Sequence, residues 1–118
     1  MTRNHTIDYI EIYITDMACA KDFYGKTFGW DFTDYSEGYV GIKKNDTQEM
    51  GGFALVDQVT KGGNLVVLYS NDIDSTLKSV ADNGGKISKE MFSFPGGKRF
   101  HFEDPSGNEL AVWTKLGT

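Results

Sequence analysis

The sequence has only one cysteine, Cys19, and only two prolines among its 118 residues. A lone cysteine excludes an intramolecular disulfide, so a reducing compartment is the natural environment. No apolar run approaches the roughly 18 residues that a membrane-spanning helix needs. The N-terminus also lacks the charged segment followed by an apolar stretch that is typical of a signal peptide. We therefore expect a cytoplasmic protein that does not bind membranes.

Basic residues are also scarce, because 12 Lys and Arg stand against 17 Asp and Glu and give a formal net charge of −5. Nucleic-acid binding draws its affinity from clustered cations, and the cations here are scattered. Nucleic acid is thus excluded as an expected partner. What the chain does contain is an ordinary globular mixture, 39% hydrophobic and 14% aromatic, at a length that suits one domain with its own core.

The stretch 96–113, GGKRFHFEDPSGNELAVW, predicts a β-hairpin with two unlike faces. In its turn, Asp104 can bond its own backbone, Pro105 presets φ, and Gly107 suits the fourth position. The apolar residues expected to face a core are Phe100, Phe102, Leu110 and Val112. The opposite face carries Arg99, His101, Glu103, Glu109, Ala111 and Trp113. Such a face suits either a functional site or a merely solvated surface.

Residues 7–14 alternate with a period of two, which predicts a strand. Its two faces are formed by Ile10, Ile12 and Ile14 on one side and by Tyr9, Glu11 and Tyr13 on the other. A helix is expected from an N-cap at Asp16 to Gly29, because apolar residues recur there at helical spacing. The strands expected next are 30–35, 39–44 and 49–56.

The second half repeats this order. Segment 64–70 is a predicted strand with apolar residues on both faces, so we expect it to be central and covered on both sides. Asp72 is the predicted N-cap of a helix that ends at Gly84. The strands expected after it are 86–92, 98–103 and 108–113.

The repeated order predicts an α+β fold of two βαβββ modules. Neither module can cover its own sheet face, so the two are expected to pair and enclose a cleft. We place them in a single domain, 1–118, with module one at about 5–56, a linker at 57–63 and module two at about 64–115.

Four segments carry a resemblance to a known family: AKDFYGKTFGW at 20–30, GGF at 51–53, NDID at 71–74 and FEDPSGNELAVW at 102–113. In this order they resemble the glyoxalase/bleomycin-resistance/extradiol-dioxygenase superfamily, also called the vicinal oxygen chelate fold. The resemblance covers nearly the whole chain. Its motifs are mostly structural, so they identify a fold and leave the chemistry open.

The resemblance implies where a metal would bind. Metal-dependent members hold one divalent ion through side chains, commonly His or Glu, on the first and last strands of the modules, where the ion polarises two adjacent substrate oxygens. These positions fall here on Tyr9, Val66 and Ala111, and near Gly51 or Gly52. Tyr is a rare ligand and the other residues are not ligands, so we predict no metal site of the usual kind and no cofactor.

A divalent metal stays possible with a different set of ligands. If the last strand is shifted by two residues, Glu109 enters the site, Glu11 already lies on the same face as Tyr9, and His101 adds a nitrogen. Imidazole and carboxylate suit Zn²⁺, Ni²⁺, Mn²⁺ and Fe²⁺ alike.

The same faces also predict a ligand pocket without metal. Its predicted lining is Tyr9, Glu11, Tyr13, Val66, Arg99, His101, Glu109, Ala111 and Trp113. Carboxylates in an aromatic cleft suit a cationic or hydrogen-bond-donating ligand, as the family's antibiotic-sequestering members suggest. The predicted catalytic pair is Glu11 and His101, with Glu11 as general base for proton removal beside a carbonyl. Alternatively, Glu11 simply bonds Arg99 or a tyrosine hydroxyl.

Three functions therefore stay open. The first is a metal-free domain that binds a small molecule, as in resistance or sequestration. The second is a metal-dependent lyase, isomerase or dioxygenase that uses Glu11, His101 or Glu109. The third is an accessory domain that acts through contact with another protein. Dimers are common in this fold and an exposed aromatic strand face favours association, so we also expect a homodimer.

Overall fold

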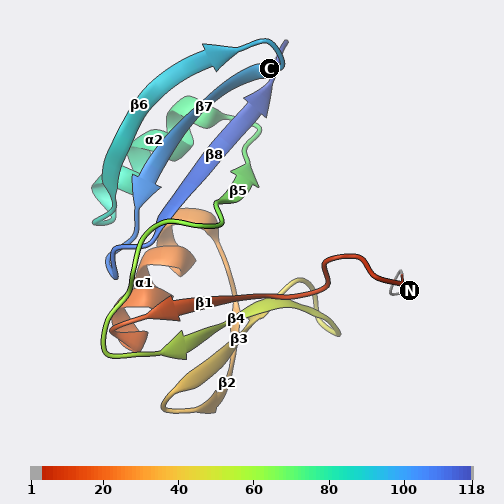
Figure 1. The fold of residues 1–118 in the computed structure, drawn as a ribbon, viewed down its shortest axis with the longest axis vertical. Coiled ribbons are helices and arrows are strands. Elements are labelled where there is room, and N and C mark those ends of the chain that lie inside the picture. The colour runs from red at the N-terminus through yellow and green to blue at the C-terminus, as the bar shows by residue number, and fades with distance from the viewer. Residues whose placement is uncertain (1–3, 118) are drawn as a thin grey trace.

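The computed structural model describes residues 4–117 and shows two similar modules at opposite ends of the long axis (Figure 1). Module one contains β1 (Ile10–Ile14), α1 (Met17–Phe28), β2 (Phe32–Ser36), β3 (Tyr39–Lys43) and β4 (Glu49–Leu55). Module two contains β5 (Val66–Tyr69), α2 (Ile73–Asp82), β6 (Lys86–Phe94), β7 (Gly97–Glu103) and β8 (Glu109–Lys115). The predicted α+β fold with two βαβββ modules is confirmed. Neither of these helices is long and apolar enough to span a membrane.

Each module forms one four-stranded sheet. Sheet A has the order β1-β4-β3-β2, and sheet B has the corresponding order β5-β8-β7-β6. In each sheet the first and last strands of the module are parallel neighbours, and the remaining pairs are antiparallel. The first strand of each module therefore lies at an edge.

The helix ends follow the predicted capping signals. Asp16 accepts a hydrogen bond from the backbone N–H of Cys19 at 2.9 Å, and Asp72 accepts one from Ser75 at 3.2 Å. These bonds satisfy N–H groups that the first turn of a helix leaves without a partner. Gly29 ends α1 in the left-handed conformation, with φ at 74°.

One hydrophobic core joins the two modules. Helix α1 lies between the sheets, because Tyr24 packs on Phe53 of β4 while Phe23 packs on Phe102 of β7, with ring centroids 5.2 and 6.0 Å apart. The four predicted core residues of the hairpin are all at most 2% exposed: Phe100, Phe102, Leu110 and Val112. The predicted faces of the hairpin are thus correct, and the modules share one packed interior.

The turn between β7 and β8 ties module two to module one. Buried Asp104 accepts hydrogen bonds from the Tyr24 hydroxyl at 2.8 Å and from the backbone N–H of Asn108 at 2.9 Å. The side-chain amide of Asn108 then donates to the carbonyl oxygen of Tyr13, in β1, at 2.6 Å. The Asp-Pro-Ser-Gly turn is therefore also a joint between the modules.

Each sheet leaves one side uncovered, and we call these sides the open face of sheet A and the open face of sheet B. Tyr13 on the first is 53% exposed, and Val67 and Tyr69 on the second are 41% and 44% exposed. The modules meet through α1 and the β7–β8 turn, so the two open faces do not cover each other within one chain.

Strand β5 corrects the expectation of a central strand covered on both sides. It pairs only with β8 and lies at the edge of sheet B. Val66 and Leu68 pack against the core, whereas Val67 and Tyr69 lie on the open face. Apolar residues on both sides of a strand show that neither side prefers water, but they do not show what covers each side.

Candidate functional site

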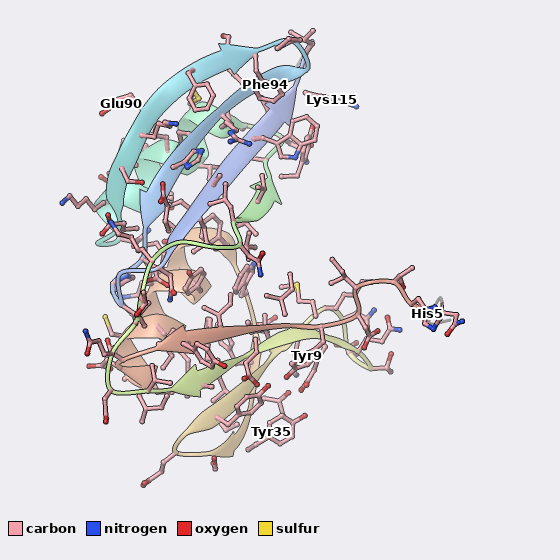
Figure 2. All side chains as sticks on the ribbon, viewed as in Figure 1. His5, Tyr9, Tyr35, Glu90, Phe94 and Lys115 are labelled. Atoms are coloured by element: carbon pink, nitrogen blue, oxygen red, sulfur yellow. The ribbon has the colours of Figure 1, made fainter. Side chains whose placement is uncertain are left out.

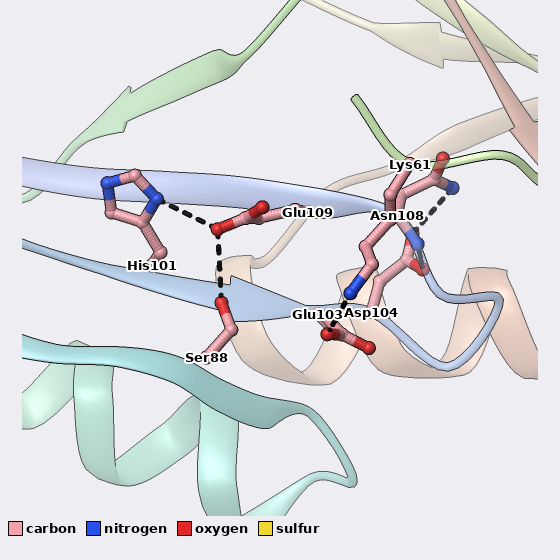
Figure 3. A network of polar contacts seen from close by, with 7 residues as sticks. All are labelled: Lys61, Ser88, His101, Glu103, Asp104, Asn108 and Glu109. Carbon is pink, nitrogen blue, oxygen red and sulfur yellow. Dashed lines mark hydrogen bonds and ion pairs between the residues drawn. The ribbon is translucent and has the colours of Figure 1, made fainter. Parts of the chain in front are cut away.

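The open face of sheet B centres on His101 of β7 and Glu109 of β8. His101 points to this face because its neighbours Phe100 and Phe102 take the core side. Its Nδ1 lies 3.0 Å from Oε2 of Glu109, and the hydroxyl of Ser88 donates to the same oxygen at 3.3 Å (Figure 3). An imidazole and a carboxylate therefore form a hydrogen-bonded pair.

The contact with Glu109 fixes which imidazole nitrogen carries the hydrogen. An ionised carboxylate can only accept, so neutral His101 donates from Nδ1 and keeps the lone pair on Nε2. His101 is only 7% exposed, and its Nε2 is buried without a hydrogen-bond partner among residues 4–117. A carboxylate orients the general-base histidine of hydrolytic triads in the same way. The pair thus presents a basic nitrogen whose hydrogen bond is still unmade.

Phe92 of β6 lies beside this imidazole and holds two cations near its ring. Its centroid is 6.0 Å from that of His101, 5.3 Å from Nζ of Lys89 and 5.5 Å from the guanidinium carbon of Arg99. The Nε of Arg99 is also buried without a partner among the described residues. This part of the open face therefore combines positive charge, an aromatic ring and two unused polar atoms.

A cavity of about 310 Å³ borders the His101–Glu109 pair. The segment that leads into β5 forms its other wall, and the full lining is Gly62, Gly63, Asn64, Leu65, Lys89, His101 and Glu109. The pair thus borders a cavity at the side of the sheet next to the linker between the modules.

The open face of sheet A carries a cluster of tyrosines and glutamates. The hydroxyls of Tyr9 and Tyr39 are hydrogen-bonded to each other, and the Tyr35 hydroxyl donates to Oε2 of Glu49 at 2.5 Å. Burial, the bond with Tyr9 and the charge of nearby Glu11 raise the pKa of Tyr39, so this phenol is neutral at pH 7. Figure 2 shows Tyr9 and Tyr35 close together on sheet A, far from Phe94 on sheet B. We call Tyr9, Glu11, Tyr35, Tyr39 and Glu49 the tyrosine platform.

Two glycines make room for the tyrosine platform. Gly41 of β3 and Gly52 of β4 face each other in register. A Cβ at Gly52 would lie 2.2 Å from the Tyr39 hydroxyl oxygen and 2.6 Å from that of Tyr9. A Cβ at Gly41 would lie 2.1 Å from a carboxylate oxygen of Glu49. The polar ends can lie flat on the sheet only because both positions lack a side chain.

Two cavities adjoin the tyrosine platform. The larger, of about 460 Å³, is lined by Ile7, Asp8, Tyr9, Ile10, Lys44, Gln48, Glu49 and Met50. The other, of about 440 Å³, is lined by Tyr9, Thr33, Tyr35, Lys43, Asn45, Asp46, Thr47, Gln48 and Glu49. Both are lined by module one alone, whereas the cavity beside His101 is lined by module two and the end of the linker.

The structure does not bring the predicted catalytic pair together within one chain. Glu11 lies on sheet A beside Tyr39, and His101 lies on sheet B against Glu109. The two sheets are joined through α1 rather than face to face, which keeps these side chains apart.

Of the residues predicted to line the pocket, only Val66 is on the wrong side of its sheet. It packs against the core and pairs in register with buried Leu110, and its neighbour Val67 occupies the open face instead. Ala111 and Trp113 pair in register with Val67 and Tyr69, so they lie on the open face as expected. A one-residue error in register moves a side chain to the opposite face.

The residues do not fit the metal ion that some relatives of this fold are expected to bind. Among residues 4–117, no three His, Cys, Asp or Glu side chains gather closely enough to hold an ion. Two phenol hydroxyls fill the space above Gly52, and Val66 is directed into the core. The alternative ligand set also fails to assemble within one chain, because Glu11 is on the other sheet from His101 and Glu109.

Sequence reasoning missed several polar and aromatic residues of the open faces: Tyr35, Tyr39, Glu49, Ser88, Lys89 and Phe92. Tyr35 and Tyr39 lie within predicted strands, but the hairpin register that brings them near Glu49 depends on irregular pairing in β2, β3 and β4. Ser88 and Phe92 lie in a strand with two further register shifts. The sequence did contain one signal for the cluster on sheet A, the glycines at 41 and 52, because such glycines mark places where other side chains lie close to the backbone.

Two βαβββ modules, each with an uncovered face lined by aromatic and polar groups, define a glyoxalase-like fold. A family model described as Glyoxalase/Bleomycin resistance protein/Dioxygenase superfamily matches residues 6–112. The chain therefore belongs to this superfamily, and the resemblance seen in its motifs is confirmed.

Individual relatives agree with this assignment. A glyoxylase-like domain-containing protein from Didymella fabae is 31% identical, with 99% of each chain covered. A solved glyoxalase-related enzyme from Fulvimarina pelagi has a TM-score of 0.79 at 19% identity, covering 94% of this chain and 88% of the other. An antibiotic-binding protein from a Streptomyces species has a TM-score of 0.70 at 20% identity, covering 98% and 99%. At these identities the two solved structures support the fold alone.

Proposed function

We propose that this protein binds a small organic molecule between its open faces, without the metal used by some members of the superfamily, and that a second copy of the chain completes the site. One observation carries this proposal: each sheet leaves uncovered a face that combines exposed aromatic rings with hydrogen-bonded polar groups. Ligand pockets have this composition, apolar walls with a few polar groups that orient the ligand.

The second copy follows from the charges and exposure of the two faces. The tyrosine platform contains the carboxylates Glu11 and Glu49, and the open face of sheet B contains the cations Lys89 and Arg99. In a twofold dimer, the open face of sheet A in each copy could lie against the open face of sheet B in the other copy. This contact would form two times, would cover all four open faces, and would place opposite charges next to each other. It would also bring Glu11 of one copy across from His101 of the other.

The comparison with known proteins supports small-molecule binding as the activity. One protein of the same fold, from a Streptomyces species, is described as antibiotic-binding, so this fold can hold an organic ligand. The positions of the usual metal hold the phenol Tyr9 and the apolar residues Val66 and Ala111. A ligand would instead meet aromatic rings, the imidazole of His101 and the carboxylates.

Two measurements test the proposal. Light scattering should give about twice the mass of one 13.2 kDa chain, and Val67→Glu, which puts a charge on the open face of sheet B, should reduce that mass. Leu116→Glu is the matched control, since this exposed residue follows β8. In a thermal-shift screen of drug-sized compounds, a ligand at about 100 times its Kd should add about 2.7 kcal/mol and raise Tm by roughly 10 °C. A monomer at working concentration, or a screen without any stabilising compound, would contradict the proposal.

Metal dependence is tested on the same protein. Metal-stripped protein should show no rise in Tm with Zn²⁺, Ni²⁺, Mn²⁺ or Fe²⁺, because the described residues of one chain offer no set of three ligands. A clear rise that Glu109→Gln abolishes would instead favour the metal-dependent enzyme, with the dimer assembling Glu11, His101 and Glu109.

The unmade hydrogen bond of His101 favours one second candidate, a metal-free enzyme that removes a proton from carbon beside a carbonyl. Nε2 would accept that proton, and Glu109 would stabilise the resulting imidazolium. Hydroxyacetone in D₂O is a suitable probe, because loss of its α-proton NMR signal reports proton removal. The wild type should exchange the proton faster than His101→Gln, and equal rates in the two proteins would exclude this candidate.

A further inference from the structure

We propose that His101 and Arg99 form a subsite for a neutral amide, a primary carboxamide or a lactam, on the open face of sheet B. The amide N–H would donate to Nε2 of His101, and the amide oxygen would accept from the Nε–H of Arg99. This inference rests on the proposed function and adds the class of ligand. Both residues belong to β7 and lie two positions apart, on the same face of the sheet.

The two nitrogens are polar atoms that are buried without a hydrogen bond. His101 is only 7% exposed and Arg99 is half-buried. Nε2 of the first and Nε of the second have no partner among residues 4–117. A buried polar atom without a partner costs free energy, which a ligand recovers when it supplies the missing bond. These atoms therefore indicate where a ligand would make its polar contacts.

The two nitrogens have fixed and opposite roles in hydrogen bonding. Nδ1 of His101 donates to the carboxylate of Glu109, so Nε2, on the other side of the ring, is an acceptor (Figure 3). The Nε–H of Arg99 can only donate, because a guanidinium has no acceptor atom. A group that satisfies both nitrogens must therefore carry a donor and an acceptor.

The surrounding charges favour a neutral group. An anion would lie near Glu109 and would bring no hydrogen for Nε2, and a cation would lie beside Arg99 and Lys89. The Nε–H of Arg99 can donate even where the far end of the guanidinium meets a carboxylate of the second copy. Residues 99 and 101 are about 7 Å apart along the strand. An amide, with N–H and C=O side by side, therefore reaches both nitrogens better than a single hydroxyl oxygen does.

Phe92 is the side chain that the ligand would displace. Its ring centroid lies 6.0 Å from that of His101 and 5.5 Å from the guanidinium carbon of Arg99. It belongs to β6, an edge strand whose pairing with β7 shifts register between Lys89 and Phe92. Such bulges are frequent at sheet edges and beside active sites. The cavity of about 310 Å³ is lined by the same imidazole, so moving this ring would extend an existing space towards Arg99.

Four planar probes of nearly equal size separate these requirements: benzamide, acetophenone, benzoate and benzamidinium. Benzamide has a donor and an acceptor, acetophenone and benzoate have acceptors only, and benzamidinium has donors only. The chain contains two histidines and two arginines, so ¹⁵N NMR of the full chain can follow Nε2 of His101 and Nε of Arg99 individually. Benzamide should shift both signals. Acetophenone should bind about tenfold more weakly, or by about 1.4 kcal/mol, because it leaves Nε2 without a donor.

Two variants test the two hydrogen bonds. Arg99→Lys keeps the positive charge and removes the Nε–H, so it should raise the Kd for benzamide about tenfold. Lys98→Arg is the matched control, because this neighbour on β7 lies 4.0 Å from Asp74 of α2, on the other side of the sheet. Glu109→Gln no longer fixes the hydrogen on Nδ1 of His101, so the preference for benzamide over acetophenone should fall. A purely structural role of Glu109 would leave that preference unchanged.

The outcomes distinguish this inference from the proposed function. Benzoate or benzamidinium binding more tightly than benzamide, at the same two signals, would overturn the amide class while supporting small-molecule binding. The inference also fails if benzamide shifts neither nitrogen, or if Lys98→Arg weakens its binding as much as Arg99→Lys. The thermal-shift screen tests the proposed function separately, because it does not depend on these four probes.

Discussion

Gly51 and Gly52 are adjacent in β4, and alanine at these two positions should have opposite consequences. At Gly51 a Cβ would lie 2.1 Å from the carbonyl oxygen of Ile10, on the neighbouring strand β1. At Gly52 the nearest atoms are the hydroxyl oxygens of Tyr39 and Tyr9. The first obstacle is backbone that is fixed in a sheet, and the second is the flexible end of a side chain.

The magnitudes follow from what must move. Overpacking against rigid surroundings costs about 1–3 kcal/mol. The Cβ of Gly51→Ala would lie closer to a backbone oxygen than van der Waals contact allows, so we expect a cost at the upper end of this range, about 3 kcal/mol. Gly52→Ala only shifts two rings and gains back the roughly 0.5–1 kcal/mol that glycine costs in a strand. We therefore expect Gly52→Ala to change the free energy of unfolding by less than about 1 kcal/mol.

Thermal unfolding by circular dichroism measures both changes. An unfolding entropy of about 2.1 cal/mol/K per residue gives roughly 0.25 kcal/mol/K for 118 residues. Gly51→Ala should then lower Tm by roughly 12 °C and Gly52→Ala should change it by less than about 4 °C. Equal losses in the two variants would refute the reasoning, because they would mean that the clash with side chains costs as much as the clash with backbone.

Three further predictions concern module two and its joint. In ¹⁵N NMR spectra neutral His101 should be protonated at Nδ1, and Glu109→Gln should produce a mixture of both tautomers; an unchanged spectrum would show that Glu109 does not orient the ring. Asp104→Ala should lower the free energy of unfolding in urea by about 3 kcal/mol, because it leaves buried hydrogen-bond donors without an acceptor; a loss below about 1 kcal/mol would contradict the role of the turn as a joint. The hydrogen bond from Lys61 lowers the pKa of Glu103. This pair therefore stabilises the fold above the usual carboxyl pKa, and its contribution is lost as the pH falls through the lowered pKa. Lys61→Gln should return the pKa of Glu103 towards normal in a ¹³C carboxyl titration, and an unchanged pKa would exclude the ion pair in solution.

Local patterns predicted most of the fold. The alternation in 96–113 placed Phe100 and Phe102 in the core, and Asp16 and Asp72 marked the starts of both helices, because each signal depends on residues close together in the chain. The repeated order of elements then gave the two modules. These predictions needed no knowledge of how distant segments meet.

The parts that failed depend on contacts between distant segments. Val66 was placed in the pocket by the resemblance to the family, whereas its pairing with Leu110 of β8 turns its side chain into the core. Glu11 and His101 were expected to meet because the modules were assumed to close face to face, whereas α1 separates the two sheets. Tyr35 and Glu49 became neighbours only through the register of β2, β3 and β4, which includes bulges. In each case the deciding contact lies between strands.

The joint at Asp104 and Asn108 also sets the order in which the chain can become stable. Asn108 completes the end of β1 by bonding to Tyr13, 95 positions earlier in the sequence. Contacts across such separations close long loops and slow folding. During synthesis, module one is therefore complete in sequence well before its first strand has all its partners. We expect the two halves to unfold in one cooperative transition, with native stability acquired only after the last hairpin has left the ribosome.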